Sequence, residues 1–262
     1  MCINSKVKKL VIPIWKPVGW TPLESILEFK KNNPEYDVVK ISYAGRLDPM
    51  AEGILLLLIG EENKKRKEYE KLNKKYESEI ILGISTDSFD ALGIIYNIKL
   101  SLPAKDDVDK CLRAFVGRQD QTYPPYSSKP VKGRPLFWWA KNNRLSEIKI
   151  PKKKIEITSI KLESIKKINA TKLFKDAEKR IKKVKGDFRQ AKILEIWEKF
   201  ADKHKHQEFL KIRILVTCLS GVYIRRLASD IGEKLGTGGF ALSITRTSVG
   251  NYTLNDTMDI RR

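Results

Sequence analysis

Apolar positions along the chain follow two periods, one typical of strands and one of helices. Alternating or continuous apolar runs of about four to eight residues indicate β-strands. Such runs occur at Leu10–Trp15, Ile54–Ile59, Tyr76–Leu82, Ile155–Leu162 and Phe209–Cys218. The run at Ile54–Ile59 is apolar at every position, which predicts a strand buried on both faces, although a buried helical segment would show the same pattern.

Apolar residues at helical spacing predict the remaining elements. Thr21 and Glu24 are spaced as a capping box, so we expect a helix that begins after Thr21 and buries Leu23, Ile26 and Leu27. Further helices are predicted over residues 61–75, 108–115, 173–184, 191–201 and 224–235. The helices at 173–184 and 191–201, separated by a Gly-Asp break, form a predicted hairpin between two strands.

The order of these elements predicts the fold class. Strands separated by helices at irregular intervals, without regular βαβ alternation, predict an α+β fold with a large mixed or antiparallel central sheet and flanking helices. We expect one domain over residues 1–262. It includes a polar loop at 119–135, which is long for a passive connector, and a lysine-rich helical insertion at about 168–208.

The charge balance points to a polyanionic partner. The chain of 262 residues has 52 Lys and Arg against 32 Asp and Glu, which gives a formal net charge of +20. Aromatic residues and glycines among the lysines favour nucleic acid over a membrane surface as the partner. The alternative is a lysine-rich surface that binds no particular partner. The apolar runs are far shorter than the roughly 18 residues of a membrane span, and no secretory signal is present, so we expect a cytoplasmic protein.

Elimination narrows the chemistry to carboxylates. The two histidines lie in the insertion without a third metal ligand, and the three scattered cysteines are expected to be reduced. Neither Cys111 nor Ser127 has a nearby base, and the Gly-rich segment 236–239 follows a predicted helix instead of opening one. Asp48 lies in a loop directly before the buried apolar run. From local sequence alone, an ordinary helix cap or Asx turn before Pro49 is the favoured interpretation of Asp48.

Several motifs follow one another in a fixed order. They are KPVGWT (16–21), AGRLDPMAEG (44–53), KY (75–76), GISTDSFDALG (83–93), the segment 121–133, GVYIR (221–225), DIG (230–232) and TRTSVG (245–250). In order and spacing they resemble the TruB family of tRNA pseudouridine synthases. This resemblance implies the pseudouridine synthase fold with an RNA-binding cleft, and an isomerase that converts uridine to pseudouridine at position 55 in the tRNA T loop without metal or cofactor.

The same resemblance implies roles for particular residues. Asp48 is then the nucleophile, Arg225 its cationic partner, and Tyr76 an aromatic that stacks on the uracil and helps to remove the C5 proton. The implied substrate-binding residues are Tyr43, Tyr223, Ile244, Gly45, Arg46 and Lys16. Residues 119–152 correspond to an RNA-gripping thumb loop, and its implied RNA-binding residues are Lys129, Lys132 and Arg134. The implied partner is the T arm of tRNA, bound by a monomer with no protein partner and no membrane.

The chain departs from the family pattern at several places, one of which is Leu219-Ser220, where the family has Ser-Lys before the GVYIR motif. Tyr43 stands where the family usually has a histidine that wedges the target base out of its loop. No small C-terminal RNA-binding domain is expected after residues 251–262, and the insertion at 168–208 is additional. We hypothesise that the insertion takes over part of the grip on tRNA, the alternative being a solvated hairpin. Two other functions stay open, an RluA/RsuA-type synthase acting on rRNA and a non-catalytic tRNA-binding or tRNA-folding protein.

Overall fold

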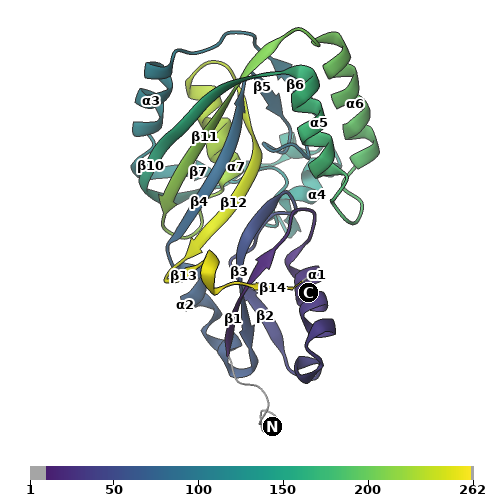
Figure 1. The fold of residues 1–262 in the computed structure, drawn as a ribbon, viewed down its shortest axis with the longest axis vertical. Coiled ribbons are helices and arrows are strands. Elements are labelled where there is room, and N and C mark those ends of the chain that lie inside the picture. Colours follow the sequence, from purple (N-terminus) through teal and green to yellow (C-terminus); the bar gives the residue numbers. More distant parts are fainter. Residues whose placement is uncertain (1–9, 261–262) are drawn as a thin grey trace.

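The computed structural model describes residues 10–260, so Cys2, one of the three cysteines, lies outside the described residues. Within this range the main feature is a ten-stranded sheet (Figure 1). Its strands are β1 (Val11–Lys16), β2 (Ile41–Ala44), β3 (Ala51–Ile59), β4 (Lys74–Leu82), β7 (Gly117–Thr122), β10 (Lys152–Asn169), β11 (Glu208–Cys218), β12 (Gly239–Val249), β13 (Tyr252–Thr253) and β14 (Met258–Asp259). Eight of them follow the order β14-β1-β3-β12-β4-β11-β10-β7, while β13 pairs with β12 and β2 with β3.

The sheet is mixed. The pairs β1/β14 and β3/β12 are parallel, whereas neighbours such as β4/β11 and β10/β11 are antiparallel. Two small hairpins lie outside it, one formed by β5 (Ile84–Thr86) and β6 (Ile95–Ile98) and the other by β8 (Pro130–Val131) and β9 (Arg134–Pro135). A mixed sheet with flanking helices confirms the predicted α+β class, and all five predicted strands are present.

The prediction of a loop from residue 119 onward was wrong at its start. Residues 117–122 form β7, which pairs antiparallel with the first residues of β10. Because β7 ends the strand order, its backbone bonds to one neighbour and its side chains can face solvent, so polar residues fit there. The predicted strand at 155–162 is also longer than expected, since β10 continues to Asn169.

Seven helices belong to residues 10–260. They are α1 (Pro22–Asn32), α2 (Arg66–Lys71), α3 (Lys105–Arg113), α4 (Leu136–Lys141), α5 (Ala170–Ile181), α6 (Gln190–Lys203) and α7 (Ile224–Lys234). The predicted helix at 61–75 is a 3-10 segment at 60–65 followed by the short α2, because the chain enters β4 at Lys74. None of the described helices is long and apolar enough to cross a membrane.

The predicted capping box of α1 is confirmed, but its predicted buried face was partly wrong. The Glu24 amide donates to Thr21 Oγ1 at 3.2 Å, and the Thr21 amide donates to the Glu24 carboxylate at 2.6 Å. Leu23 and Leu27 are 61% and 58% exposed. Phe29, which is fully buried, packs with Ile26 in the cluster between α1 and the β1/β3 pair. The helix therefore faces the sheet through positions 22, 25, 26 and 29, and turns the two leucines outward.

The predicted helical hairpin is confirmed as α5 and α6, which lie side by side in Figure 1. Trp197 of α6 is fully buried against Phe240 of β12, with ring centroids 5.4 Å apart, and its Nε1–H donates to the Gly93 carbonyl at 3.0 Å. The hairpin shares one apolar cluster with residues of the central strands β4 and β12. It is thus part of the hydrophobic core, while α3 and α7 pack in a second cluster.

Candidate active site

Asp48 lies in the loop between β2 and β3, as the motif predicted. Its backbone carbonyl accepts a hydrogen bond from Ala51 N at 3.0 Å, and the strand β3 begins at Ala51. No helix follows, so Asp48 is not a helix cap. Its side chain is 27% exposed. The carboxylate is therefore partly open to solvent, in a loop held by the start of β3, which is buried along nearly its whole length.

Arg225 holds this carboxylate from the first turn of α7. Its Nε donates to Asp48 Oδ2 at 2.7 Å, although the two residues are 177 positions apart. Its Nη1 donates to the Ser88 carbonyl at 2.9 Å and its Nη2 to the Tyr126 carbonyl at 3.1 Å. With a side chain only 3% exposed, Arg225 joins three loops from distant parts of the chain at one point.

A second carboxylate, Asp90, shapes the field around Arg225. Burial lowers the pKa of Arg225, but the charges of Asp48 and Asp90 outweigh this effect and raise it. Burial raises the pKa of Asp90 to about 6, although Arg225 and a hydrogen bond from Ser88 Oγ at 2.6 Å act in the opposite direction. Asp90 was not predicted as a site residue. The signal was available, since it is the second aspartate of the 83–93 motif.

Aromatic and apolar side chains surround the carboxylate. Tyr76 on β4 and Ile244 on β12, which are 8% and 5% exposed, share the core cluster that includes Leu47 of the Asp48 loop. Burial raises the pKa of Tyr76, and its phenol lies within reach of the Asp48 charge. Burial and then Asp48 raise the pKa of Tyr223, which precedes α7. The structure therefore places Tyr76 and Tyr223 where the charge of Asp48 acts on them, and Ile244 on β12 opposite Ala51, where β3 begins.

Tyr223 is tied to the thumb. Gln121 exchanges two hydrogen bonds with the Tyr223 backbone, at 2.8 and 3.1 Å, and the Tyr123 ring packs edge-on against the Tyr223 ring at 5.8 Å. Lys153 lies 4.3 Å above the Tyr223 ring, and burial lowers its pKa to about 8. This cation beside the aromatic wall was not predicted, because nothing in a lysine-rich strand distinguishes it from its neighbours.

Lys16 and Gly45 support the site from within. Lys16 is completely buried, and its Nζ donates to the carbonyls of Pro17 at 2.9 Å and Trp20 at 2.7 Å. Burial lowers its pKa to about 7, although the charge of Asp48 opposes the shift. The Gly45 carbonyl accepts from Arg246 Nη2 at 3.0 Å. Arg246, which is 1% exposed and was not predicted, thus anchors the loop that carries Asp48.

Tyr43 and Arg46 lie at the rim of the same loop. Arg46 Nη2 donates to the Tyr43 hydroxyl at 3.1 Å, and the Arg66 guanidinium lies 5.3 Å from the centre of the Tyr43 ring. Tyr43 is half-buried on β2 and Arg46 is exposed. Tyr43 therefore contacts two arginines, one through its hydroxyl and one through its ring.

The predicted thumb residues lie together on the 119–152 segment. The Lys129 ammonium lies 5.4 Å above the Tyr123 ring, and the Arg134 guanidinium lies 4.2 Å above the Trp138 ring. Lys132, whose backbone has φ +47, donates from Nζ to the Glu147 carbonyl at 3.2 Å. Lys132 and Arg134 are exposed and Lys129 is half-buried. Cations stacked on aromatic rings form a surface suited to a nucleic-acid backbone and its bases.

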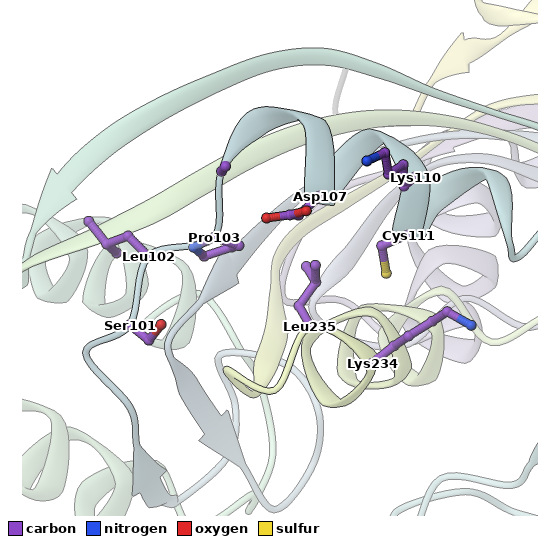
Figure 2. A pocket seen from close by; sticks show the side chains of 9 residues that line it. Ser101, Leu102, Pro103, Asp107, Lys110, Cys111, Lys234 and Leu235 are labelled. Carbon is purple, nitrogen blue, oxygen red and sulfur yellow. The ribbon is translucent and has the colours of Figure 1, made fainter.

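A separate cavity of about 570 Å³ lies between α3, the end of α7 and the loop before α3 (Figure 2). None of the predicted site residues lines it. Burial raises the pKa of the Cys111 thiol there, and its Sγ lies 3.8 Å from the Ile231 carbonyl, so the thiol is suited to packing and not to reaction. No group of three or more His, Cys, Asp or Glu within residues 10–260 could hold a metal ion.

The mixed sheet with its flanking helices has the pseudouridine synthase fold. Two solved structures share this fold with the chain. One is a chain of an H/ACA ribonucleoprotein bound to a substrate RNA containing 2'-deoxyuridine. It is 16% identical to this chain with a TM-score of 0.58, and the match covers 96% of this chain and 51% of that chain. The other is a chain of a Cbf5-Nop10-Gar1 complex. It is 17% identical with a TM-score of 0.56, and the match covers 93% of this chain and 50% of that chain.

The family model described as TruB family pseudouridylate synthase (N terminal domain) matches residues 33–175, more than half of the chain. The chain belongs to this family. Relatives named tRNA pseudouridine synthase B are 27% identical in Oceanobacillus iheyensis, over 95% of this chain and 68% of the relative, and 29% identical in Staphylococcus aureus strain Newman, over 96% and 70%. The relative in Psychrobacter cryohalolentis is 28% identical over 95% of this chain and 58% of its own length.

These findings confirm the predicted family, its fold and its class as an isomerase. They favour the TruB assignment over the RluA/RsuA-type alternative. The chain spans 58 to 70% of the length of these curated relatives.

Proposed function

We propose that this chain isomerises uridine to pseudouridine in the T loop of tRNA, at position 55, with Asp48 as the nucleophile. The observation that carries the proposal is the Asp48–Arg225 pair, whose atoms are 2.7 Å apart, with the arginine buried and the carboxylate partly open. Aspartate has a reference pKa of about 3.9 and needs no general base to ionise at pH 7. A buried arginine keeps such a carboxylate charged when a base displaces water from it.

The reaction rearranges one nucleoside and needs no second reactant. The bond between N1 of uracil and C1' of the ribose breaks, the detached uracil turns, and C5 forms a new bond to C1'. The proton on C5 leaves to solvent and N1 gains one, so the atoms balance. The carboxylate attacks either the base or the sugar in this scheme. In both cases Asp48 must stand beside a flipped-out uridine, and its partly open side permits that.

Tyr76, Tyr223 and Ile244 are proposed to line the pocket of the flipped base. Flipping costs a few kcal/mol, and stacking on one aromatic ring returns about 1–3 kcal/mol. Because burial raises the pKa of Tyr76, its phenol is neutral near pH 7, which favours stacking. Removal of the C5 proton by this phenol would first require its own ionisation, which burial opposes.

The grip on tRNA is proposed to come from the thumb and from the insertion. Lys129, Lys132 and Arg134 hold the T arm, with Tyr43 and Arg46 at the rim. In α5 and the turn after it, the exposed lysines without an ion-pair partner among the described residues are Lys175, Lys179, Lys183 and Lys185. The insertion thus extends the cationic surface beyond the thumb. In this proposal the chain is a single catalytic domain that acts as a monomer in the cytoplasm.

Release of tritium from C5-labelled uridine in a T-arm RNA tests the proposal. Wild type and Asp202→Asn, which removes an exposed carboxylate on α6, should release tritium. Asp48→Asn should bind the same RNA and release none. Wild-type protein that binds the RNA without releasing tritium would make the chain a non-catalytic RNA-binding protein, and full activity of Asp48→Asn would exclude Asp48 as the nucleophile. A labelled rRNA fragment run in parallel identifies the substrate class.

A further inference from the structure

The turn between α5 and α6 lies directly against the loops of the active site. The Lys185 amide donates to the Gly19 carbonyl at 3.1 Å, and the Lys185 ammonium lies 4.2 Å above the Trp20 ring. A Cβ atom placed on Gly19 would lie 1.9 Å from the Lys183 carbonyl oxygen. The contact is therefore so close that only glycine fits at position 19.

Arg189, the last residue of this turn, makes an ion pair with the loop that follows β5. Its Nη1 lies 3.0 Å from Asp87 Oδ2 and its Nη2 lies 3.4 Å from Asp87 Oδ1. The Tyr126 hydroxyl donates to the same Oδ2 at 3.0 Å, and the Arg189 guanidinium lies 4.5 Å from the centre of the Tyr126 ring. Arg189 and Asp87 side chains are 26% and 29% exposed, so the pair is shielded from most of the solvent.

The residues that Arg189 joins are the ones that hold Arg225. Tyr126, which contacts both Asp87 and Arg189, supplies the carbonyl that accepts from Arg225 Nη2. Ser88, the residue after Asp87, supplies the carbonyl that accepts from Arg225 Nη1. Both carbonyl partners of the catalytic-site arginine thus belong to segments that the Arg189–Asp87 pair connects.

The same hairpin also reaches the carboxylate side of the site. Arg180 on α5 donates from Nη2 to the Met50 carbonyl at 3.1 Å and lies 3.5 Å from the Glu52 carboxylate. Met50 is two residues after Asp48 in the loop before β3. One helical hairpin therefore contacts both the loop that carries Asp48 and the loop that supplies the Ser88 carbonyl to Arg225.

The backbone at Arg189 indicates that this geometry is maintained against strain. Arg189 has φ +65, a left-handed conformation that is uncommon for residues other than glycine. Its amide donates to Asp187 Oδ1 at 3.1 Å, and the Gln190 side chain bonds to the Phe188 amide at 2.8 Å and to the Gly186 carbonyl at 2.7 Å. The turn is thus held by its own hydrogen bonds in the form that directs Arg189 toward Asp87.

We propose that Arg189 is a positioning residue for the isomerisation, which holds the Ser88 and Tyr126 carbonyls where they align Arg225 with Asp48. The inference rests on the proposed function, since it assigns Asp48 and Arg225 to the reaction. Arg189 does not touch the reacting atoms. Its loss acts through a shift of Arg225, and a misplacement of about 1 Å in an active site can lower a rate about 100-fold.

Steady-state tritium release with Arg189→Ala, Arg189→Lys and Asp87→Asn, each beside a T-arm binding measurement, tests the inference. Arg189→Ala should lower kcat by about 10- to 100-fold, with RNA affinity changed less than about threefold. Arg189→Lys should recover part of the rate, because it restores the charge without the two-point contact. The control Arg113→Ala removes an exposed arginine on α3 and should be unchanged.

Coupling between the two partners separates positioning from other roles. If the ion pair acts as one unit, Arg189→Ala combined with Asp87→Asn should cost little more than either change alone. Additive losses, a loss confined to RNA affinity, or a lower melting temperature with unchanged kcat would overturn the inference. If Arg189→Ala does not fold, the same criteria apply to Arg189→Lys and Asp87→Asn. Asp48→Asn in the same series tests the proposed function separately, because its full activity would refute that function whatever Arg189 does.

Discussion

Arg225→Met removes the guanidinium at the centre of the site and keeps an apolar side chain in its place. The buried carbonyl of Ser88 and the partly buried carbonyl of Tyr126 lose their donors, and a buried group left without a partner costs about 1–3 kcal/mol. Asp48 and Asp90 also lose their cation. Breaking a buried ion pair on one side costs about 3–5 kcal/mol in total, and these contributions overlap. We expect the free energy of unfolding at pH 8 to fall by about 3–5 kcal/mol.

The size of this loss should depend on pH through Asp90. Burial raises the folded-state pKa of Asp90 to about 6, above the ordinary value of 3.8, and the charge of Arg225 opposes that shift. A carboxyl whose pKa is raised by folding stabilises the fold at low pH, and that contribution is lost as pH rises through the folded-state value. Without Arg225 the charged form becomes still less favourable. The difference between wild type and Arg225→Met should therefore be smaller at pH 5 than at pH 8.

Urea unfolding at pH 5 and pH 8, followed by the fluorescence of the five tryptophans, measures both effects. Arg113→Met, a change at an exposed arginine of α3, is the control and should stay within about 0.5 kcal/mol of wild type. A loss below about 1 kcal/mol at pH 8, or an equal loss at both pH values, would refute the reasoning that Arg225 compensates two carboxylates and two carbonyls.

Three further variants test other contacts. Thr21→Ala removes the helix cap and should lower the free energy of unfolding by about 1 kcal/mol in urea titrations. Gly19→Ala places a Cβ 1.9 Å from the Lys183 carbonyl at a residue with φ +91, so it should displace the α5–α6 turn and speed amide hydrogen exchange there. Lys175→Gln with Lys179→Gln should flatten the salt dependence of tRNA binding by about one unit of slope per lysine that contacts a phosphate. An unchanged slope would return α5 to the solvated alternative.

The apolar pattern predicted the strands well because burial on both faces leaves a clear signal. The run at 54–59 contains only apolar residues, and β3 is buried along nearly its whole length. The pattern failed where one turn of a helix offers two apolar faces. Leu23 and Leu27 are spaced as well as Ile26 and Phe29, and the packing of Ile26 and Phe29 against the β1/β3 pair and Tyr36 decides which pair faces inward. That contact is made outside the helix and leaves no trace in its periodicity.

The site was accessible to sequence only through the ordered motifs. Local sequence favoured an ordinary cap or turn for Asp48 over a functional role. Its partner Arg225 lies 177 residues away, and no pattern of period two or 3.6 connects the two residues. Asp90 and Arg246 lie in the 83–93 and 245–250 motifs, but the motifs did not indicate a role for either residue. Their importance comes from burial beside other charges, which depends on how loops meet in three dimensions. Arg189 lies in no motif, because it belongs to the insertion. Its partner Asp87, in contrast, lies in the 83–93 motif.

The insertion cannot be tested by deletion, because its two faces do different things. Trp197 on its inner face is fully buried in the core and hydrogen-bonded to Gly93, so removing the hairpin would expose the sheet before any effect on RNA could be measured. Its lysines on the outer face are exposed, and Arg189 at its turn contacts the active-site loops. Stability, RNA affinity and catalytic alignment therefore depend on different side chains of one element. Point substitutions on each face separate them, since substitutions at distant positions without shared partners act nearly independently.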